Sequence, residues 1–149
     1  MPTRPAPAAR TAVIERELVF LARWLEAAQR KQSYPMERAS YLLLLRLESD
    51  GPQRVAHLAA SLGLDGSTVT RQLTALDAAG WITRSSHPQD ARATLVAATA
   101  AGLRAMDDLR RFRIGRIAAL FGDWSAAEQA ELGRVLGHLN QVLERNALG

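Results

Sequence analysis

The stretch "VAHLAASLGLDGSTVTRQL" (residues 55–73) decides how the chain folds, because it contains two short helices and the signals that separate them. Its first part places apolar side chains on one helical face, and Gly63 suits the left-handed residue just past a helix end. Asp65 is a good N-cap for the next helix, and Leu64 can contact Val69 across the first turn as a hydrophobic staple. Two helices joined by such a tight turn have the form of a helix-turn-helix.

The second of these helices presents short polar side chains outward. At roughly 100° per residue, Val69, Leu73 and Leu76 define its buried side. The outward face and its flanks carry Ser67, Thr68, Thr70, Arg71, Gln72 and Thr74. Short hydroxyl side chains let a helix approach a DNA groove and donate to phosphates, while Arg and Gln are long enough to reach base edges. The alternative is a solvated face with a capping turn, since Ser and Thr are common at helix starts.

The period of the pattern changes after Gly80. Residues 81–85 ("WITRS") and 93–97 ("ATLVA") are typical of two short strands, separated by the polar, proline-containing loop 86–92 ("SHPQDAR"). A hairpin directly after a helix-turn-helix is the wing of a winged helix. The sequence therefore predicts a winged helix-turn-helix.

Two residues of the hairpin loop, Asp90 and Arg92, are candidates for DNA contact. An arginine at a wing tip can enter the narrow minor groove, where the negative potential is strongest, and a neighbouring aspartate can hold it extended. The alternative is a surface ion pair between the two, worth about 0–1 kcal/mol. Arg84 and His87 are lesser candidates for phosphate contact, and Arg54 could reach the backbone from in front of the first short helix.

Helical patterns flank this region on both sides. We expect a mainly α protein with a small β-hairpin wing, in which a winged helix-turn-helix domain is flanked by N- and C-terminal dimerisation helices. The predicted parts are a disordered lead-in (1–10), an N-terminal dimerisation helix (11–34), the DNA-binding domain (35–98) and C-terminal dimerisation helices (99–149). Within the last part, Thr99 is expected to cap one helix, and Ser125 with Glu128 forms the capping box of the next.

The first and last helices carry more apolar surface than a small core can cover. The first has two adjoining apolar stripes, and the last has one continuous stripe. Unless they pair with a second copy, that surface stays in water. We therefore expect an isologous homodimer built from the two ends of the chain.

Composition excludes several classes of function. The 149 residues include no cysteine, which removes disulfides, thiol redox sensing and cysteine-based metal sites. The three histidines, His57, His87 and His138, are too scattered in the sequence to form a ligand cluster. No G-x-S-x-G, S-x-x-K or H-E-x-x-H motif and no phosphate-binding glycine loop is present, so we expect neither an enzyme nor a cofactor.

Charge is a weak guide to the partner. The net charge is +4, but no segment forms a basic block, so DNA binding has to rest on particular residues. The N-terminus lacks the apolar segment of a secretory signal, and no apolar run approaches the ~18–20 residues needed to cross a bilayer. We expect a cytoplasmic protein without membrane contact.

Several motifs together resemble the winged helix of the MarR-type transcriptional regulators. They are "STVTRQL" at 67–73, "AAGWITR" at 78–84, D-x-R at 90–92 and the spacing from Thr99 to Gly102. The order of the flanking helices also fits, so the resemblance covers nearly the whole chain.

The resemblance implies a homodimer that binds a pseudo-palindromic operator in double-stranded DNA, usually as a repressor. By the same resemblance, the DNA contacts carry over to Ser67, Thr68, Thr70, Arg71, Gln72, Asp90 and Arg92. Such regulators are often released from DNA by a small ligand, frequently a phenolic or other aromatic compound. The side chains we place near a ligand pocket are Trp24, Tyr41, Leu45 and Met106, although aromatic residues at helical spacing are also typical of plain core.

A second function class stays open at this point. The same fold can serve as a helical, dimeric interaction protein without specific DNA binding, because helix-turn-helix geometry also occurs in proteins that do not bind DNA.

Overall fold

The computed structural model describes residues 7–31 and 34–147. Within these ranges the chain forms six helices and one three-stranded antiparallel sheet, so the predicted fold class is confirmed. The chain divides into two compact units, Met1–Pro35 and Met36–Gly149, and each is described by itself.

The first unit contains one helix, α1 (Pro7–Lys31). The expected disorder through residue 10 is wrong for residues 7–10, while residues 1–6 lie outside the described part of the chain. The helix starts early because proline suits a first helical position, where its fixed φ is helical and its missing N–H needs no acceptor. Along α1 the large apolar side chains are exposed, among them Ile14, Phe20 and Trp24.

The second unit begins with the three helices α2 (Arg38–Asp50), α3 (Val55–Leu62) and α4 (Gly66–Ala78). The turn between α3 and α4 is closed by Gly63, whose φ of 59° and ψ of 30° are left-handed, as the sequence predicts. The amide of Gly63 donates to the carbonyl of Ala60, and the amide of Leu64 donates to that of Ala59, both at 3.1 Å. These bonds end α3 and direct the chain into α4.

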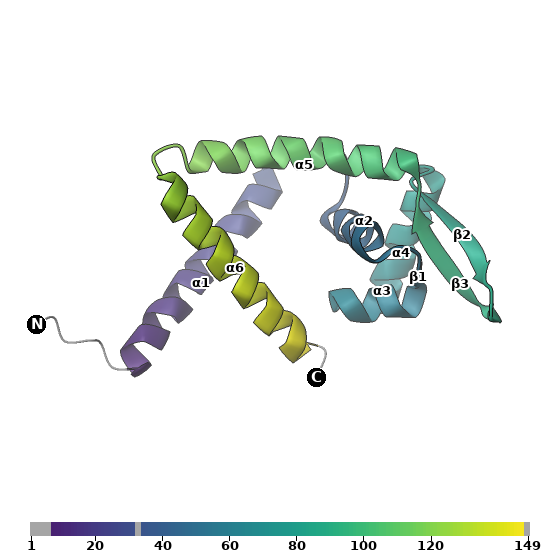
Figure 1. Cartoon of the computed structure of the whole chain (residues 1–149), viewed down its shortest axis with the longest axis horizontal. Helices are drawn as coiled ribbons and strands as arrows, with labels where there is room; N and C mark the ends of the chain where they lie inside the picture. The colour runs from purple at the N-terminus through teal and green to yellow at the C-terminus, as the bar shows by residue number, and fades with distance from the viewer. Residues whose placement is uncertain (1–6, 32–33, 148–149) are drawn as a thin grey trace, which may run out of the picture. The chain divides into compact units, whose positions relative to one another are not determined.

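The sheet contains β1 (Gln53–Arg54), β2 (Ile82–His87) and β3 (Asp90–Ala98), in the order β1-β3-β2. The β2–β3 hairpin is the predicted wing (Figure 1), and its strands extend further than expected, so the loop between them shortens to residues 88–89. Strand β1 was not predicted, because two residues show no periodicity. It pairs with β3 through Gln53 and Val96, which joins the wing to the start of α3.

A single apolar core holds this unit together. It contains Leu43, Leu44, Leu47, Leu58, Val69, Leu73, Leu76, Ile82, Val96, Met106 and Leu109, each at most 4% exposed. These residues come from α2, α3, α4, both long strands and the first half of the next helix. The three α4 residues expected to face inward are all among them.

Helix α5 (Ala100–Leu120) follows the wing, and a turn leads into α6 (Ala126–Ala147), as Figure 1 shows. The side chain of Thr99 caps α5 by accepting from the amide of Gly102 at 3.0 Å. At the start of α6, the Ser125 amide donates to the Glu128 carboxylate at 2.8 Å, and the Glu128 amide donates back to the Ser125 hydroxyl at 3.3 Å. Both predicted caps are therefore present.

Gly102 also permits a close approach between α5 and the entry to the wing. A Cβ at this position would lie 2.1 Å from the backbone oxygen of Trp81. The amide of Thr99 donates to that same oxygen at 3.0 Å. The spacing from Thr99 to Gly102 therefore seats the first turn of α5 on the wing.

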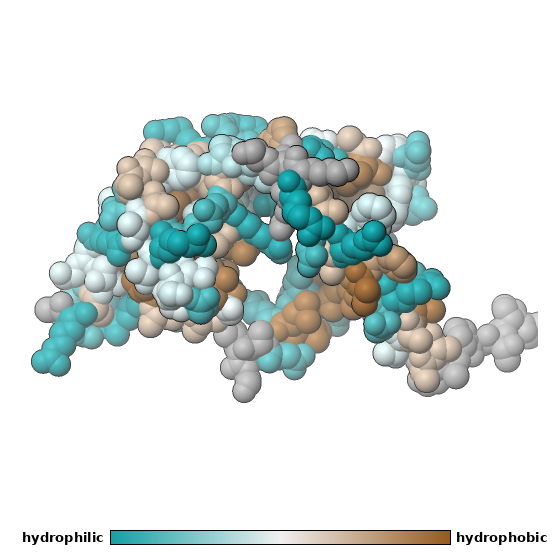
Figure 2. Space-filling view, turned by 180° about the vertical axis from the view of Figure 1, so that it is seen from behind, coloured by the Kyte–Doolittle hydropathy of each residue, from teal (hydrophilic) through white to brown (hydrophobic). Residues whose placement is uncertain are grey.

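Large apolar side chains also lie exposed on the second half of α5 and along α6. They include Phe112, Ile114, Ile117 and Leu120 on α5, and Val135, Leu136 and Leu143 on α6, with Trp124 in the turn between the two helices. Hydrophobic atoms accordingly reach the surface in the space-filling view (Figure 2). Within the described residues, no helix is long and apolar enough to span a membrane.

Candidate nucleic-acid interface

Helix α4 has one buried side and one exposed polar side. Val69 and Leu73 are fully buried and Leu76 is 1% exposed, while Arg71 and Thr74 are exposed. Ser67 and Thr70 are exposed as well, and Thr68 is half-buried. The polar face predicted from the helical periodicity therefore exists, with one exception.

The exception is Gln72, which was expected to flank the exposed face and contact DNA. The structure contradicts this, because Gln72 is only 2% exposed. Its side-chain oxygen accepts a 2.6 Å hydrogen bond from the Ser40 hydroxyl, and its amide nitrogen donates at 2.6 Å to the Glu37 carboxylate. Ser40 lies in the first turn of α2 and Glu37 is its N-cap residue, so tertiary contacts hold the Gln72 amide inside the protein.

The first turn of α4 is organised around the carboxylate of Asp65. It accepts from the amide and the hydroxyl of Thr68 at 2.8 and 2.7 Å, and from the hydroxyl of Ser67 at 2.5 Å. These bonds hold the pKa of the Asp65 carboxyl well below its usual range, and the bonds from the two hydroxyls lower it most. Asp65 is thus the N-cap that the sequence predicts, and it stays ionised at neutral pH.

The remaining hydroxyls of α4 also donate within the helix. Thr70 donates to the carbonyl of Gly66 at 2.8 Å, and Thr74 donates to the carbonyl of Thr70 at 2.9 Å. Each hydroxyl would have to give up one of these bonds to donate to a phosphate, although each keeps lone pairs that can accept. The long donor that α4 presents to a partner is therefore Arg71.

The guanidinium of Arg71 lies beside Glu37, the N-cap residue of α2. Its Nη2 atom is 3.8 Å from Oε2 of Glu37, and the two side chains are 69% and 65% exposed. An ion pair this exposed is screened by solvent and readily exchanged. Arg71 thus remains accessible from outside.

The ion pair of the wing involves a residue of β1. The Asp90 carboxylate accepts from the backbone amide of Arg92 at 3.1 Å, but its ion-pair partner is Arg54, at 3.8 Å. An ion pair between Asp90 and Arg92, the alternative to a minor-groove contact of Arg92, does not form among the described residues, and Asp90 links β1 to the wing instead. Arg92 is exposed, and no ion pair holds its guanidinium among the described residues.

The two lesser candidates of the wing have intramolecular partners. Arg84 donates to the Asp77 carboxylate of α4 at 3.1 Å. Nδ1 of His87 accepts from the backbone amide of Gln89 at 3.1 Å, which stabilises the tight turn between the strands. Arg84 thus ties the wing to α4, and His87 shapes the wing tip.

The residues expected near a ligand pocket differ in how deeply they are buried. Met106 is fully buried and Tyr41 is 8% exposed, with Arg113 stacked over the Tyr41 ring at 4.9 Å. Leu45 is half-buried, and Trp24 is 65% exposed on α1. The plain-core interpretation therefore fits Tyr41 and Met106.

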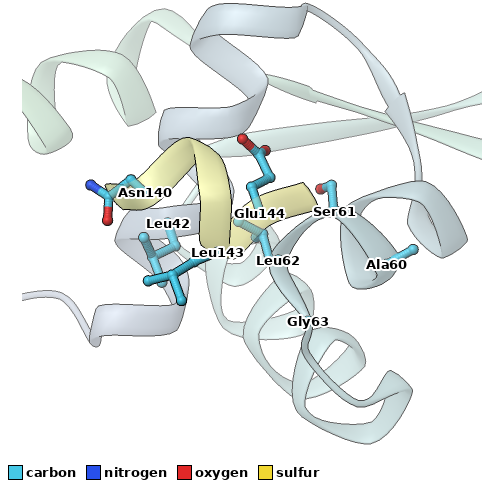
Figure 3. A pocket seen from close by; sticks show the side chains of 8 residues that line it. All are labelled: Leu42, Ala60, Ser61, Leu62, Gly63, Asn140, Leu143 and Glu144. Carbon is cyan, nitrogen blue, oxygen red and sulfur yellow. The ribbon is translucent and has the colours of Figure 1, made fainter. Parts of the chain in front are cut away.

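A different cavity, of about 340 Å³, opens beside the helix-turn-helix. Figure 3 shows its lining, in which Leu42, Leu62 and Leu143 provide apolar walls while Asn140 and Glu144 provide polar groups. Glu144 is held by a 2.6 Å ion pair to Arg46 of α2. The sequence pattern did not indicate this cavity, because α6, which supplies one of its walls, is distant along the chain from α2 and α3.

Comparison with known proteins agrees with this geometry. The model of the MarR family matches residues 36–94, from the start of α2 into the wing. The chain is also 36% identical over 133 residues to the uncharacterized HTH-type transcriptional regulator YxaD of Bacillus subtilis, covering 87% of this chain and 92% of that protein. The chain belongs to the MarR family of transcriptional regulators.

Solved structures share the fold of this MarR-family protein. RV1404 of Mycobacterium tuberculosis is 28% identical, with a TM-score of 0.70 over 89% of this chain and 92% of that one. BpsR of Bordetella bronchiseptica, whose DNA binding is regulated by 6-hydroxynicotinic acid, is 22% identical, with a TM-score of 0.64 over 83% and 96%. Because this chain belongs to a family of transcriptional regulators, it is not an enzyme.

Proposed function

We propose that this MarR-family protein binds a pseudo-palindromic operator in double-stranded DNA as a homodimer and represses transcription. The observation that carries the proposal is the two-sided character of α4. Its apolar side is fully packed against the core, and its opposite side exposes Ser67, Thr70, Arg71 and Thr74. A helix fixed to a rigid core and thin on its outer side suits the major groove.

Within this proposal, Arg71 makes the principal contact of α4 with a base edge or a phosphate. Its side chain is long and exposed, whereas the neighbouring hydroxyls already donate within the helix. A bidentate contact between arginine and guanine discriminates against a wrong base by about 1–3 kcal/mol. Arg71 therefore contributes most of the base recognition by α4.

The wing adds a contact in the neighbouring minor groove through Arg92. Three other arginines of the domain, Arg54, Arg71 and Arg84, each lie near a carboxylate. Arg92 carries an exposed charge near the tip of the wing, where it can meet the strong negative potential of a narrow A·T groove.

Exposed apolar helices support the homodimer. Side chains such as Val13 and Leu25 of α1, Ile117 of α5 and Val135 of α6 are between 46% and 53% exposed in the single chain. Monomeric proteins rarely leave so many large apolar side chains in water. Two copies would place their α4 helices in successive major grooves about 34 Å apart, and a dimer bound over a promoter would exclude RNA polymerase.

The proposal includes release by a small aromatic effector. The cavity of about 340 Å³ falls within the range of roughly 300–1,000 Å³ typical of small-molecule sites. It lies between α2, the turn after α3 and the last part of α6, so a bound compound would bias how the helix-turn-helix meets a dimer helix. The regulation of BpsR by 6-hydroxynicotinic acid is a precedent on the same fold. A compound can shift the dimer only by as much as it prefers the non-binding state.

Selection of bound fragments from genomic DNA tests the DNA-binding proposal. The purified protein should enrich fragments that share a pseudo-palindromic site, bind that site with a stoichiometry of two chains, and sediment as a dimer without DNA. Recovery of fragments without a shared sequence would support the alternative of an interaction protein that does not read DNA. Screening aromatic compounds for release of the selected site then identifies the effector.

A further inference from the structure

Helix α4 carries a buried amide directly beside its exposed arginine. Among the described residues, Gln72 and Ser40 are the buried polar side chains, at 2% and 4% exposure. Two hydrogen bonds of 2.6 Å tie Gln72 to α2, one from the Ser40 hydroxyl and one to Oε2 of Glu37. Helix α4 cannot turn about its axis relative to α2 without breaking both bonds.

The same atom of Glu37 also faces Arg71. Oε2 lies 3.8 Å from Nη2 of Arg71, so a single carboxylate oxygen contacts a buried amide and an exposed guanidinium. Glu37 occupies the N-cap position of α2, yet its side chain makes no capping hydrogen bond there. The carboxylate is thus directed toward α4 and away from the end of its own helix.

The hydrogen bond from Gln72 requires an acceptor at position 37, which the side-chain oxygen of a neutral glutamine would also supply, so it does not account for the negative charge. Glu37 and Arg71 are 65% and 69% exposed, and such pairs contribute little to folding because solvent screens them. A carboxylate next to a helix that approaches DNA also repels phosphates. Its position therefore weakens the attraction of Arg71 for any DNA backbone.

We propose that Glu37 is a specificity-determining residue for DNA binding. Its charge offsets the attraction of Arg71 for phosphate, and its bond to Gln72 aims the guanidinium, so that Arg71 contributes to binding only where a matching base edge is present. Binding to arbitrary DNA depends on phosphate charge, whereas operator binding adds base contacts. This inference rests on the proposed function, in which α4 enters the major groove.

Glu37→Gln tests the proposal, because the variant keeps an oxygen that accepts from Gln72 and loses the charge. Fluorescence anisotropy measures its affinity for the selected operator and for a scrambled duplex over a range of salt concentrations. At low salt we expect affinity for the scrambled duplex to rise about threefold per protomer, or about tenfold per dimer. Operator affinity should change less, so the ratio of operator to scrambled affinity falls. For the scrambled duplex, the slope of the logarithm of the binding constant against the logarithm of the salt concentration should become more negative by about one to two units.

Glu26→Gln is the matched control. Glu26 of α1 forms a similar exposed pair with Arg30, at 3.9 Å and with exposures of 69% and 71%, and the substitution changes the net charge equally. Equal shifts in the two variants would mean that net charge alone acts, which overturns the proposal. A parallel loss of affinity for both duplexes with a lowered Tm would reveal a structural role and overturn it as well.

The wild-type protein separates this inference from the proposed function. A wild type that does not discriminate between the two duplexes overturns the proposed function, and this inference with it. A wild type that discriminates, while Glu37→Gln behaves like Glu26→Gln, overturns the inference about Glu37 alone.

Discussion

The hydroxyl of Ser40 donates a 2.6 Å hydrogen bond to the side-chain oxygen of Gln72, joining α2 to α4 inside the core. Gln72→Ala would leave this hydroxyl without its acceptor and open a small cavity. We expect the free energy of unfolding to fall by about 1–3 kcal/mol. Urea denaturation measures the change.

Thr74→Ala is the control for Gln72→Ala, since it removes an exposed hydroxyl from the same helix. Its stability should stay within about 0.5 kcal/mol of wild type. If Gln72→Ala instead left stability unchanged and altered the base preference, Gln72 would be a DNA contact and the buried interpretation would be wrong.

The close approach of Gly102 to Trp81 makes a second substitution informative. A Cβ at Gly102 would lie 2.1 Å from a backbone oxygen, so Gly102→Ala forces α5 away from the wing. We expect a loss of about 1–3 kcal/mol in the free energy of unfolding, as in overpacked cores. Gly115→Ala has open space around it and should stabilise α5 by about 0.5–1 kcal/mol. Equal effects of the two variants would contradict the close packing at Gly102.

The signals that were correctly predicted from the sequence are local. Gly63, Asp65, Thr99 and Ser125 end or begin helices through bonds that reach no more than a few residues, so their neighbours in the sequence suffice to identify them. The wing was also predicted, because strand alternation and turn residues are local too.

What the sequence did not reveal depends on distant partners. Gln72 has the helical position of a flanking residue, and only Ser40 and Glu37, 32 and 35 residues away, bury it. The Asp90 carboxylate pairs with Arg54 of β1, a strand too short to show a pattern. Helical periodicity assigns a face to each residue but does not identify the partner of a polar side chain.

The ion pair between Arg46 and Glu144 links the end of α6 to the winged helix at 2.6 Å. Glu144→Gln would weaken this link without changing the core. We expect amide hydrogens in the last turns of α6 to exchange about two- to fivefold faster, while those of α2 and α4 stay protected. Glu131→Gln breaks only the local pair with Arg134 and should leave the end of α6 unchanged. Unaltered exchange in Glu144→Gln would show that the ion pair does not hold α6.

The lowered pKa of Asp65 predicts a pH dependence of stability. A carboxyl whose pKa is depressed in the folded state stabilises the protein fully above the unfolded pKa of about 3.9, and the contribution is lost as the pH falls below that value. Asp65→Asn keeps a capping oxygen but cannot ionise. The Tm of wild type should exceed that of the variant at neutral pH, and the difference should shrink as the pH falls from about 5 to 2. A difference independent of pH would contradict the ionised cap.

Arg92 offers a test of the wing that is separate from α4. In our proposal Arg92→Ala weakens binding most at operators flanked by narrow A·T minor grooves, because the arginine responds to groove width. Anisotropy with operators that have A·T or G·C flanks measures this preference. An equal loss of affinity for operators with A·T and with G·C flanks would show that Arg92 contacts phosphate without responding to groove width.

The central claim is that the exposed face of α4 reads DNA sequence through Arg71. Its most direct test is the ratio of affinities for the selected operator and a scrambled duplex, measured by fluorescence anisotropy for the wild type and for Arg71→Ala. We predict that Arg71→Ala lowers operator affinity at least about tenfold and scrambled affinity much less, so that the ratio collapses. An unchanged ratio in a folded, dimeric Arg71→Ala variant would contradict the claim.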